Sequence, residues 1–342
     1  MESQVKSSVK AQAMDLQTAI NYGKLVALAE AVNHLGATMV PLVSRKPEDL
    51  INPTSGVYEK ICNDPSYADI VDVNFLKNYK LLYNVQMNDD TIIGIQLAYY
   101  GFVAQNKNFP YNYVMAIRGT QAQVEWIDDA LINPLPFKDV TNGGQVAAGF
   151  LTLFESGLLV TPPDVKNGTL PLLKLKDVAK NPTWAMPDAG KVPTVISGHS
   201  LGSALATLYA ISTANNSGGK SGDLSVYTFA SPMVGDQTFA DTYNKSPLEN
   251  YRICNIQDVI PTLPIWNDNN NNNVYVQVGG EYPIDSSKYP EIYHQQDNDQ
   301  DKEKTKGCAH VLPTYLYVLE KMANMNPNQD MLNADGCGCL SK

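Results

Sequence analysis

The sequence lacks three features that would place it in other protein classes. No apolar run approaches the roughly eighteen residues that a membrane-spanning helix needs. Residues 1–14 are polar and lack the apolar core of a signal peptide. The formal net charge of −10 disfavours nucleic acids and strongly anionic membranes as partners, but it is compatible with a neutral or zwitterionic lipid surface. We therefore expect a soluble chain without a transmembrane segment, either cytoplasmic or the mature form of a secreted protein.

Cysteine is also scarce, and its pattern is uninformative. The five cysteines are an odd number at scattered spacings, which fits neither a disulfide framework nor a zinc site. We predict no metal site and no disulfide framework. Residues 326–342, which include Cys337 and Cys339, are expected to form a flexible tail. The sequence sets no oligomeric state.

The order of predicted elements favours an α/β fold. An amphipathic pattern over residues 15–35 predicts an N-terminal helix that ends at Gly36, a good C-cap residue. Alternation of strand and helix patterns then predicts a mostly parallel central sheet flanked by helices. We expect one domain over residues 1–342, because no linker or repeat divides the chain. The predicted strands cover residues 81–85, 91–99 and 101–105, with a turn at 88–90, and then 113–117, 192–197, 224–229, 251–256 and 275–278; the last helix covers 312–322.

The pentapeptide Gly198-His199-Ser200-Leu201-Gly202 is the most informative motif in the chain. Roughly one chain in ten of this length contains G-x-S-x-G by chance, so the bare motif is weak. Its context is stronger, because a β-branched strand pattern precedes it and a small-residue helix pattern follows it. A strand that turns through G-x-S-x-G into a helix presents a serine nucleophile in a strained turn. We predict that Ser200 is a nucleophile, against the alternative of a simple glycine-bounded turn.

A serine hydroxyl needs a histidine to accept its proton and a carboxylate to orient that histidine. With this type of elbow, the acid and then the histidine follow the serine along the chain. This order leaves His294 and His310 as the candidates for the histidine. We favour His310, because it lies just before a predicted helix, whereas His294 lies in a very polar segment. His34 is expected to be structural, and His199 to be a hydrogen-bonded packing residue.

The orienting acid should follow a strand of the parallel sheet, where the carboxyl ends of the strands meet. Asp258 follows the strand predicted over residues 251–256 and is our candidate. Asp236 and Asp241 follow the preceding strand and are the alternatives.

These residues belong to a longer series of motifs, which resembles the class 3 lipases, the family of the filamentous-fungal triacylglycerol lipases. The resemblance covers roughly residues 90–320 and implies an α/β-hydrolase fold. No single motif is specific, but the series follows the family's order. The matching pieces are Ile117-Arg118-Gly119-Thr120, Glu125-Trp126, Gly149-Phe150, the pentapeptide, Phe229-Ala230-Ser231-Pro232-Met233-Val234-Gly235, Asp258-Val259-Ile260-Pro261, Val278-Gly279-Gly280-Glu281 and His310.

The resemblance implies roles for further residues. Thr120 and the backbone N–H of Leu201 would form the oxyanion hole, and Arg118 would pair with a carboxylate beneath the site. A short lid helix over residues 121–131 would cover the site and contact substrate. Its apolar residues would be Val124, Trp126, Ile127 and Leu131.

The family likeness implies a lipase that hydrolyses acylglycerol esters at a lipid–water interface through an acyl-enzyme, without metal or organic cofactor. The alternatives within enzymes are a phospholipase A1, a general esterase and an acyltransferase. From another class, the alternative is a lipase-fold binding or signalling protein without turnover.

Overall fold

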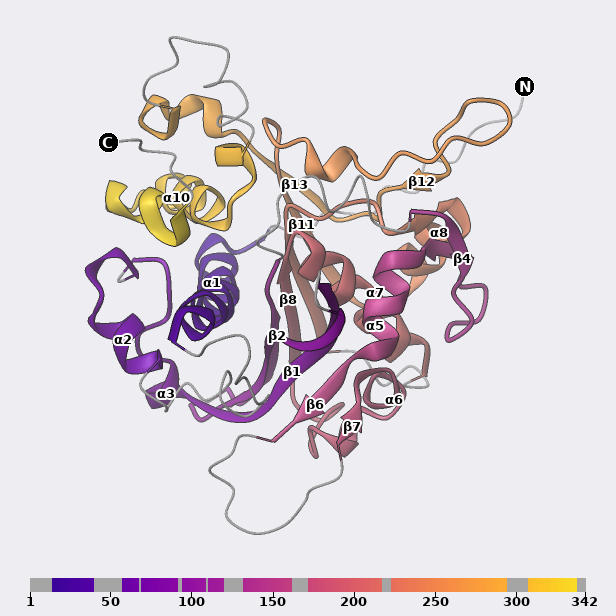
Figure 1. The fold of residues 1–342 in the computed structure, drawn as a ribbon, viewed down its shortest axis with the longest axis horizontal. Coiled ribbons are helices and arrows are strands. Elements are labelled where there is room, and N and C mark those ends of the chain that lie inside the picture. The colour runs from indigo at the N-terminus through magenta and orange to yellow at the C-terminus, as the bar shows by residue number, and fades with distance from the viewer. Residues whose placement is uncertain are drawn as a thin grey trace.

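A nine-stranded sheet with helices on both faces organises the molecule (Figure 1). The computed structural model describes residues 14–39, 57–67, 69–91, 94–108, 110–119, 132–161, 172–216, 223–293 and 307–336. The sheet strands, in spatial order, are β13 (Glu281–Ile284), β11 (Glu249–Asn255), β9 (Leu224–Phe229), β8 (Thr194–His199), β3 (Tyr113–Ile117), β2 (Gly94–Asn106), β1 (Tyr79–Thr91), β6 (Leu158–Val160) and β7 (Leu173–Lys174).

The strands nearest the pentapeptide run parallel, as the sequence predicts. β3 pairs with β8, β8 with β9, β9 with β11, and β11 with β13, all in parallel register. β1, β2, β6 and β7 extend this block with antiparallel pairings. The parallel block brings the carboxyl ends of β3, β8 and β11 to one edge of the sheet, which is where a site is expected in such folds.

One face of the sheet is covered by helices from the two ends of the described chain. α1 (Leu16–Met39) and α10 (Leu312–Met322) pack together there, with α2 (Val57–Asn63) and α3 (Phe75–Asn78) beside them (Figure 1). Buried residues of α1 and α10 form one hydrophobic cluster with the sheet, so α1 is part of the core and not an appendage.

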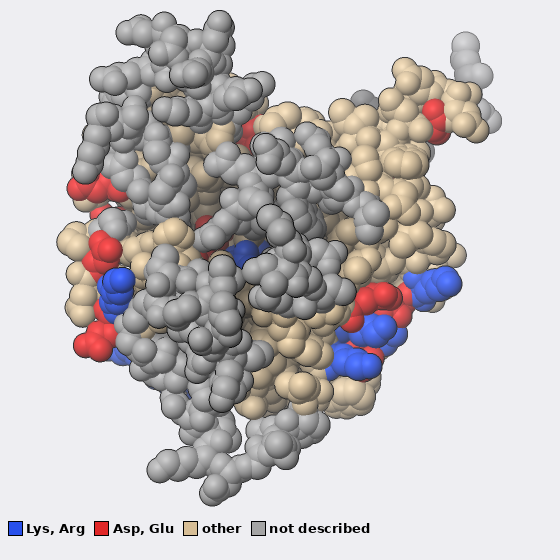
Figure 2. Space-filling model, in the orientation of Figure 1, with Lys and Arg blue, Asp and Glu red and all other residues tan. Residues whose placement is uncertain are grey.

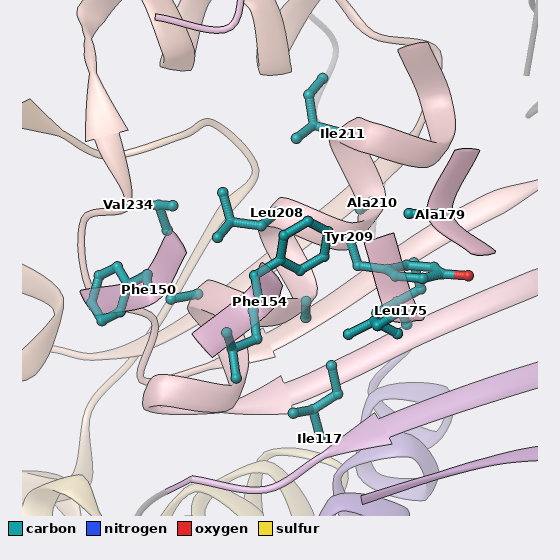
Figure 3. Close-up of a cluster of buried hydrophobic side chains, with 14 of the residues drawn as sticks. Ile117, Phe150, Phe154, Leu175, Ala179, Leu208, Tyr209, Ala210, Ile211 and Val234 are labelled. Carbon is teal, nitrogen blue, oxygen red and sulfur yellow. The ribbon is translucent and has the colours of Figure 1, made fainter. Parts of the chain in front are cut away.

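The opposite face carries α5 (Ala148–Ser156), α6 (Leu175–Lys180), α7 (Leu201–Asn216) and α8 (Gln237–Lys245). α7 is buried along nearly its whole length, which explains its small-residue sequence. Figure 3 shows Leu208, Tyr209 and Ile211 of α7 among Phe150 and Phe154 of α5 in this second cluster.

A small second sheet, which the sequence analysis did not predict as a unit, lies beside α8. Its order is β12 (Tyr275–Val276), β10 (Gly235–Asp236), β5 (Gln145–Ala147) and β4 (Pro134–Pro136). Its strands are two or three residues long, which is too short for an alternating pattern to be recognised.

Most predicted boundaries agree with the structure, but one predicted turn and one predicted helix end are wrong. The turn predicted at 88–90 lies inside β1, where Asn88 pairs with Leu97; the register instead shifts between Val85 and Gln86, near Gly101 with φ of 150°. Gly36 does not end the first helix, because α1 continues to Met39. A helix interior tolerates one glycine at a cost of about 1 kcal/mol.

The surface and the cysteines add three facts. On the face shown in Figure 2, the described acidic and basic side chains lie next to one another along two edges and form no large single-sign patch. None of the described helices is long and apolar enough to cross a membrane. Cys62 and Cys254 are free, whereas Cys308 is disulfide-bonded, a bond that the cysteine spacing did not predict.

The contact between α1 and α10 can be tested at Gly23. A Cβ atom there would lie 2.6 Å from Leu316 Cδ2 and 3.0 Å from the Phe229 ring. Alanine would improve helix propensity by about 1 kcal/mol, but overpacking costs about 1–3 kcal/mol. We expect Gly23→Ala to lower the free energy of unfolding in urea by about 1 kcal/mol. In a Leu316→Ala background the same change should cost less; equal costs in both backgrounds would contradict this packing.

Candidate active site

Ser200 occupies the sharp turn between β8 and α7. Its φ is +53°, in the left-handed region that non-glycine residues adopt rarely. The Ser200 N–H donates to the carbonyl of Phe229 at 2.9 Å, which ties the turn to β9. A Cβ on Gly198 would lie 2.3 Å from the Gly202 carbonyl oxygen, and one on Gly202 would lie 2.3 Å from that of Ile117. The two glycines are therefore required by close backbone approach on both sides of the serine.

His310 lies between Ser200 and Asp258 and is hydrogen-bonded to both. Its Nε2 is 2.9 Å from Ser200 Oγ, and its Nδ1 is 2.9 Å from Asp258 Oδ2. One tautomer satisfies both contacts: Nδ1–H donates to the carboxylate, and Nε2 accepts from the serine hydroxyl. These residues are separated by 52 and 110 positions along the chain. The arrangement can remove the proton of Ser200 and stabilise the resulting imidazolium.

Asp258 is fixed in the turn that follows β11. It is 5% exposed, and its Oδ1 accepts from the N–H of Ile260 at 2.9 Å. The alternative acids have other partners. Asp236 caps α8 by accepting from the Phe239 N–H, and Asp241 accepts from Gln237.

Tyr315 is a residue of the site that the sequence analysis missed. Its hydroxyl donates to Asp258 Oδ2 at 2.7 Å and accepts from the Asn255 N–H at 3.1 Å. Burial, and then the negative charge of Asp258, raise the pKa of Tyr315 well above its usual range. The phenol therefore stays protonated and acts as a fixed donor to the carboxylate that orients His310. Tyr315 stands in the first turns of α10, five positions after His310, but an aromatic residue in a buried helix carries no specific signal.

The predicted oxyanion hole is only partly within the described residues. Leu201 is the first residue of α7, and the first N–H groups of a helix have no partner within it. Thr120 and the predicted lid residues Val124, Trp126, Ile127 and Leu131 lie outside the described residues, as does His294. Gly119, which precedes Thr120, lies against the elbow: a Cβ there would be 3.2 Å from Ser200 Cβ.

Arg118 differs from the prediction. Within the described residues it has no carboxylate partner; its guanidinium donates to the carbonyls of Tyr99 and Gly119, each at 2.6 Å, and lies over the Tyr100 ring. It therefore ties the end of β3 to β2 through backbone acceptors.

Removing the Tyr315 hydroxyl tests its role beside Asp258. A hydrogen bond to a charged group contributes about 1.5–3 kcal/mol, so we expect Tyr315→Phe to slow phosphonylation of Ser200 by a fluorophosphonate roughly tenfold. Tyr317→Phe is the matched control, because Tyr317 lies on the same helix α10 and its hydroxyl donates to Glu291, away from Asp258. Equal rates for wild type and Tyr315→Phe would contradict the assignment.

The chain matches known proteins in both sequence and fold. Residues 114–268 match the family model described as Lipase (class 3). Phospholipase A1-II 1 of Oryza sativa subsp. indica is 30% identical over 187 residues, covering 52% of this chain and 44% of that protein. Phospholipase A1-IIgamma of Arabidopsis thaliana is 31% identical over 195 residues, covering 52% and 42%. The chain thus spans less than half the length of these plant relatives.

Among solved structures, a deletion mutant of the Rhizomucor miehei lipase propeptide complex superposes with a TM-score of 0.51 at 21% identity, covering 81% of this chain and 70% of that one. This likeness establishes the α/β-hydrolase fold that the element order and motifs predict. Residues 114–268 thus match the model of the same family, the class 3 lipases, that the motifs of the chain resemble.

Proposed function

We propose that this protein is a serine carboxylic ester hydrolase that acts on acyl lipids, with Ser200, His310 and Asp258 as its catalytic residues. The observation that carries the proposal is the hydrogen-bonded series from Asp258 through His310 to Ser200, with 2.9 Å at each step. A non-catalytic protein of this fold would have no need to hold a serine at a positive φ against a histidine.

In this mechanism Ser200 Oγ attacks the ester carbonyl while its proton passes to His310 Nε2. Asp258, held by Tyr315, stabilises the imidazolium that forms. His310 then returns the proton to the leaving alcohol, which leaves an acyl-enzyme. A water molecule, deprotonated by His310, releases the acid and restores the serine. The chemistry uses no metal or organic cofactor.

The tetrahedral intermediate carries a negative oxygen that needs donors. The Leu201 N–H at the start of α7 is one proposed donor, and the positive end of the helix dipole supports it. Thr120 is the second proposed donor, because it directly follows Gly119, whose backbone packs against Ser200. Each such donor contributes about 3 kcal/mol of transition-state stabilisation.

Exposed apolar side chains favour a lipid substrate over a small soluble ester. Ile256 and Val259 lie on either side of Asp258 in the sequence and are 61% and 38% exposed. Ile265 and Trp266, a few residues further on, are 56% and 40% exposed. Four large exposed apolar side chains on one segment beside the acid suit contact with acyl chains. The segment over residues 121–131, with Trp126 and Ile127, is proposed as the lid on the basis of the family likeness.

The ester class has two candidates. Acylglycerols are the first candidate, because the fold of this chain is similar to that of a Rhizomucor miehei triacylglyceride lipase. Phospholipids are the second, because the sequence relatives with 30% identity are named phospholipases A1.

Replacing the nucleophile tests the reaction. We expect Ser200→Ala to lower ester hydrolysis by at least about 10⁴-fold while thermal unfolding changes little, because the residual rate of triad knockouts reflects binding and oxyanion stabilisation alone. Release of fatty acid from a mixed-micelle substrate measures this. Ser203→Ala is the matched control, since the hydroxyl of that buried serine donates to the carbonyls of Gly198 and Phe229 and not to His310. Full turnover by Ser200→Ala would reject the nucleophile.

An ester panel tests the substrate class. Tributyrin above and below its solubility limit, long-chain triacylglycerol emulsion, and phosphatidylcholine vesicles would be compared at equal enzyme concentration. We expect a rise in rate when tributyrin passes its solubility limit, because an apolar surface gains contact area only at an interface. A rate that follows dissolved ester alone would identify a general esterase, and preference for vesicles would identify a phospholipase.

A further inference from the structure

A second carboxylate–imidazole pair lies directly beside the proposed catalytic residues. Glu30 of α1 reaches His199 of the pentapeptide, with 2.8 Å between Oε1 and Nδ1. His199 Nε2 in turn lies 2.8 Å from the backbone carbonyl oxygen of His310. The side chains of His199 and Glu30 are 7% and 18% exposed. The rings of His199 and His310 are 5.0 Å apart, so the two pairs lie side by side.

The partners of His199 determine its protonation. A backbone carbonyl only accepts hydrogen bonds, so Nε2 must carry a proton. Glu30 Oε1 also accepts from the Gly119 N–H at 3.3 Å, and with Glu30 ionised the short contact to Nδ1 places a proton on that nitrogen as well. With both ring nitrogens donating, His199 is an imidazolium paired with the Glu30 carboxylate.

The charged surroundings agree with this state. Burial opposes the charge, but Glu30, the His310 carbonyl and the more distant Asp258 outweigh it and raise the pKa of His199 above its usual value. From α10, the Tyr315 ring centroid lies 6.3 Å away. Arg118 donates to the Gly119 carbonyl on the β3 side. His199 thus faces the carboxylate of Glu30, with which it is paired, and the carboxylate of Asp258, which is hydrogen-bonded to His310. Among the described residues, no other cationic side chain pairs with Glu30.

We propose that Glu30 and His199 are positioning residues. They hold the main chain at His310 and at Gly119, so that the general base His310 and the end of β3 that leads to Thr120 both lie against Ser200. The pair makes two hydrogen bonds to other segments, one to the helical turn that ends at His310 and one to Gly119 after β3, and the contact between Glu30 and His199 joins α1 to the elbow. This inference rests on the proposed function. It makes α1, which lies outside the matched region 114–268, part of the active-site framework.

The space around the pair leaves little freedom for its members. A Cβ on Gly119 would lie 3.0 Å from His199 Nδ1 and 3.2 Å from the His199 carbonyl oxygen. The His199 ring therefore fills the space between the end of β3 and the helical turn that ends at His310. A shift of about 1 Å in a catalytic group can cost roughly 100-fold in rate.

The charge state predicts a specific pH dependence. Because the pKa of His199 is raised in the folded protein, the stabilisation by the charged Glu30–His199 pair is complete below the ordinary histidine pKa. It is lost as the pH rises through the pKa of His199 in the folded protein. Neutral His199 keeps its proton on Nε2 for the His310 carbonyl, and its Nδ1 lone pair then faces the Glu30 carboxylate. Glu30→Gln removes this conflict at His199, since an amide N–H donates to neutral Nδ1, but the amide nitrogen can no longer accept from the Gly119 N–H.

The charge state is tested without any substrate by ¹⁵N-histidine NMR on the full chain. The sequence has four histidines, and His199→Phe assigns the signal by its loss. At about pH 8, above the ordinary histidine pKa of about 6.5, we expect one wild-type imidazole to keep protons on both nitrogens. Glu30→Gln should convert that signal to the neutral Nε2–H form. A singly protonated His199 in the wild type at this pH would overturn the proposal.

The positioning role is tested by kcat and KM against pH on a soluble short-chain ester. We expect Glu30→Ala and His199→Phe to lower kcat at least tenfold with KM within about twofold, since positioning acts on the chemical step. Glu30→Gln should recover part of the Glu30→Ala loss, because it restores the His199 contact without the Gly119 one, and should abolish the alkaline decline in kcat that we expect in wild type as His199 loses its proton.

Glu320→Gln is the matched control. Glu320 is a buried carboxylate of α10, and it pairs with Lys24 of α1, the helix that also carries Glu30, instead of with Ser200, His310 or His199. It should lower stability and leave kcat and its pH profile unchanged. Equal kcat losses in Glu320→Gln and Glu30→Ala, or a kcat for Glu30→Ala within twofold of wild type, would overturn the proposal. If wild type itself hydrolyses no ester, the proposed function fails, and the NMR result still decides the charge state of the pair.

Discussion

The site depends on how closely the start of α7 approaches the end of β3. A Cβ on Gly202 would lie 2.3 Å from the Ile117 carbonyl oxygen and 2.5 Å from that of Arg118, so only a bare backbone fits between helix and strand. This contact directs the N-terminus of α7 toward the strand end that leads to Thr120. It also holds Ser200 in a conformation that an isolated chain would avoid. The surrounding core supplies the stability that this strain consumes.

Asp258 reaches His310 from the turn after β11, and His310 reaches Ser200 from the end of a helical turn over residues 307–310; polar contacts hold each of these turns to a longer element. Tyr315 of α10 holds the loop after β11 through Asp258, and Asn255 at the end of β11 donates to the Ala309 carbonyl next to His310. These contacts join the last helix to the sheet by hydrogen bonds as well as by packing. A histidine at the end of a short helical turn can act as a base only if such contacts restrict it.

The sequence predicted the central elements well, because β3, β9 and α10 combine a strong apolar pattern with clear boundaries. It also named Ser200, Asp258 and His310, since chain order and strand ends restrict the choice of partners. It did not find Tyr315 or the contact from Glu30, because a polar group on a mostly buried helix has no local pattern that indicates its distant partner. The small second sheet was missed for the same reason, because its strands come from segments far apart in the chain. The disulfide of Cys308 was missed because five cysteines at scattered spacings do not indicate a pairing.

The packing of α1 against α10 has a consequence for biosynthesis. Ser200 precedes His310 by 110 residues, and Glu30 precedes His199 by 169. A ribosome therefore releases the elbow and the first helix well before the base and the last helix. Because a domain generally folds as a unit, α1 and the elbow would reach their native packing only once α10 has been synthesised. The hydrogen-bonded series Asp258–His310–Ser200 therefore assembles late in synthesis, together with the packing of α10 on α1.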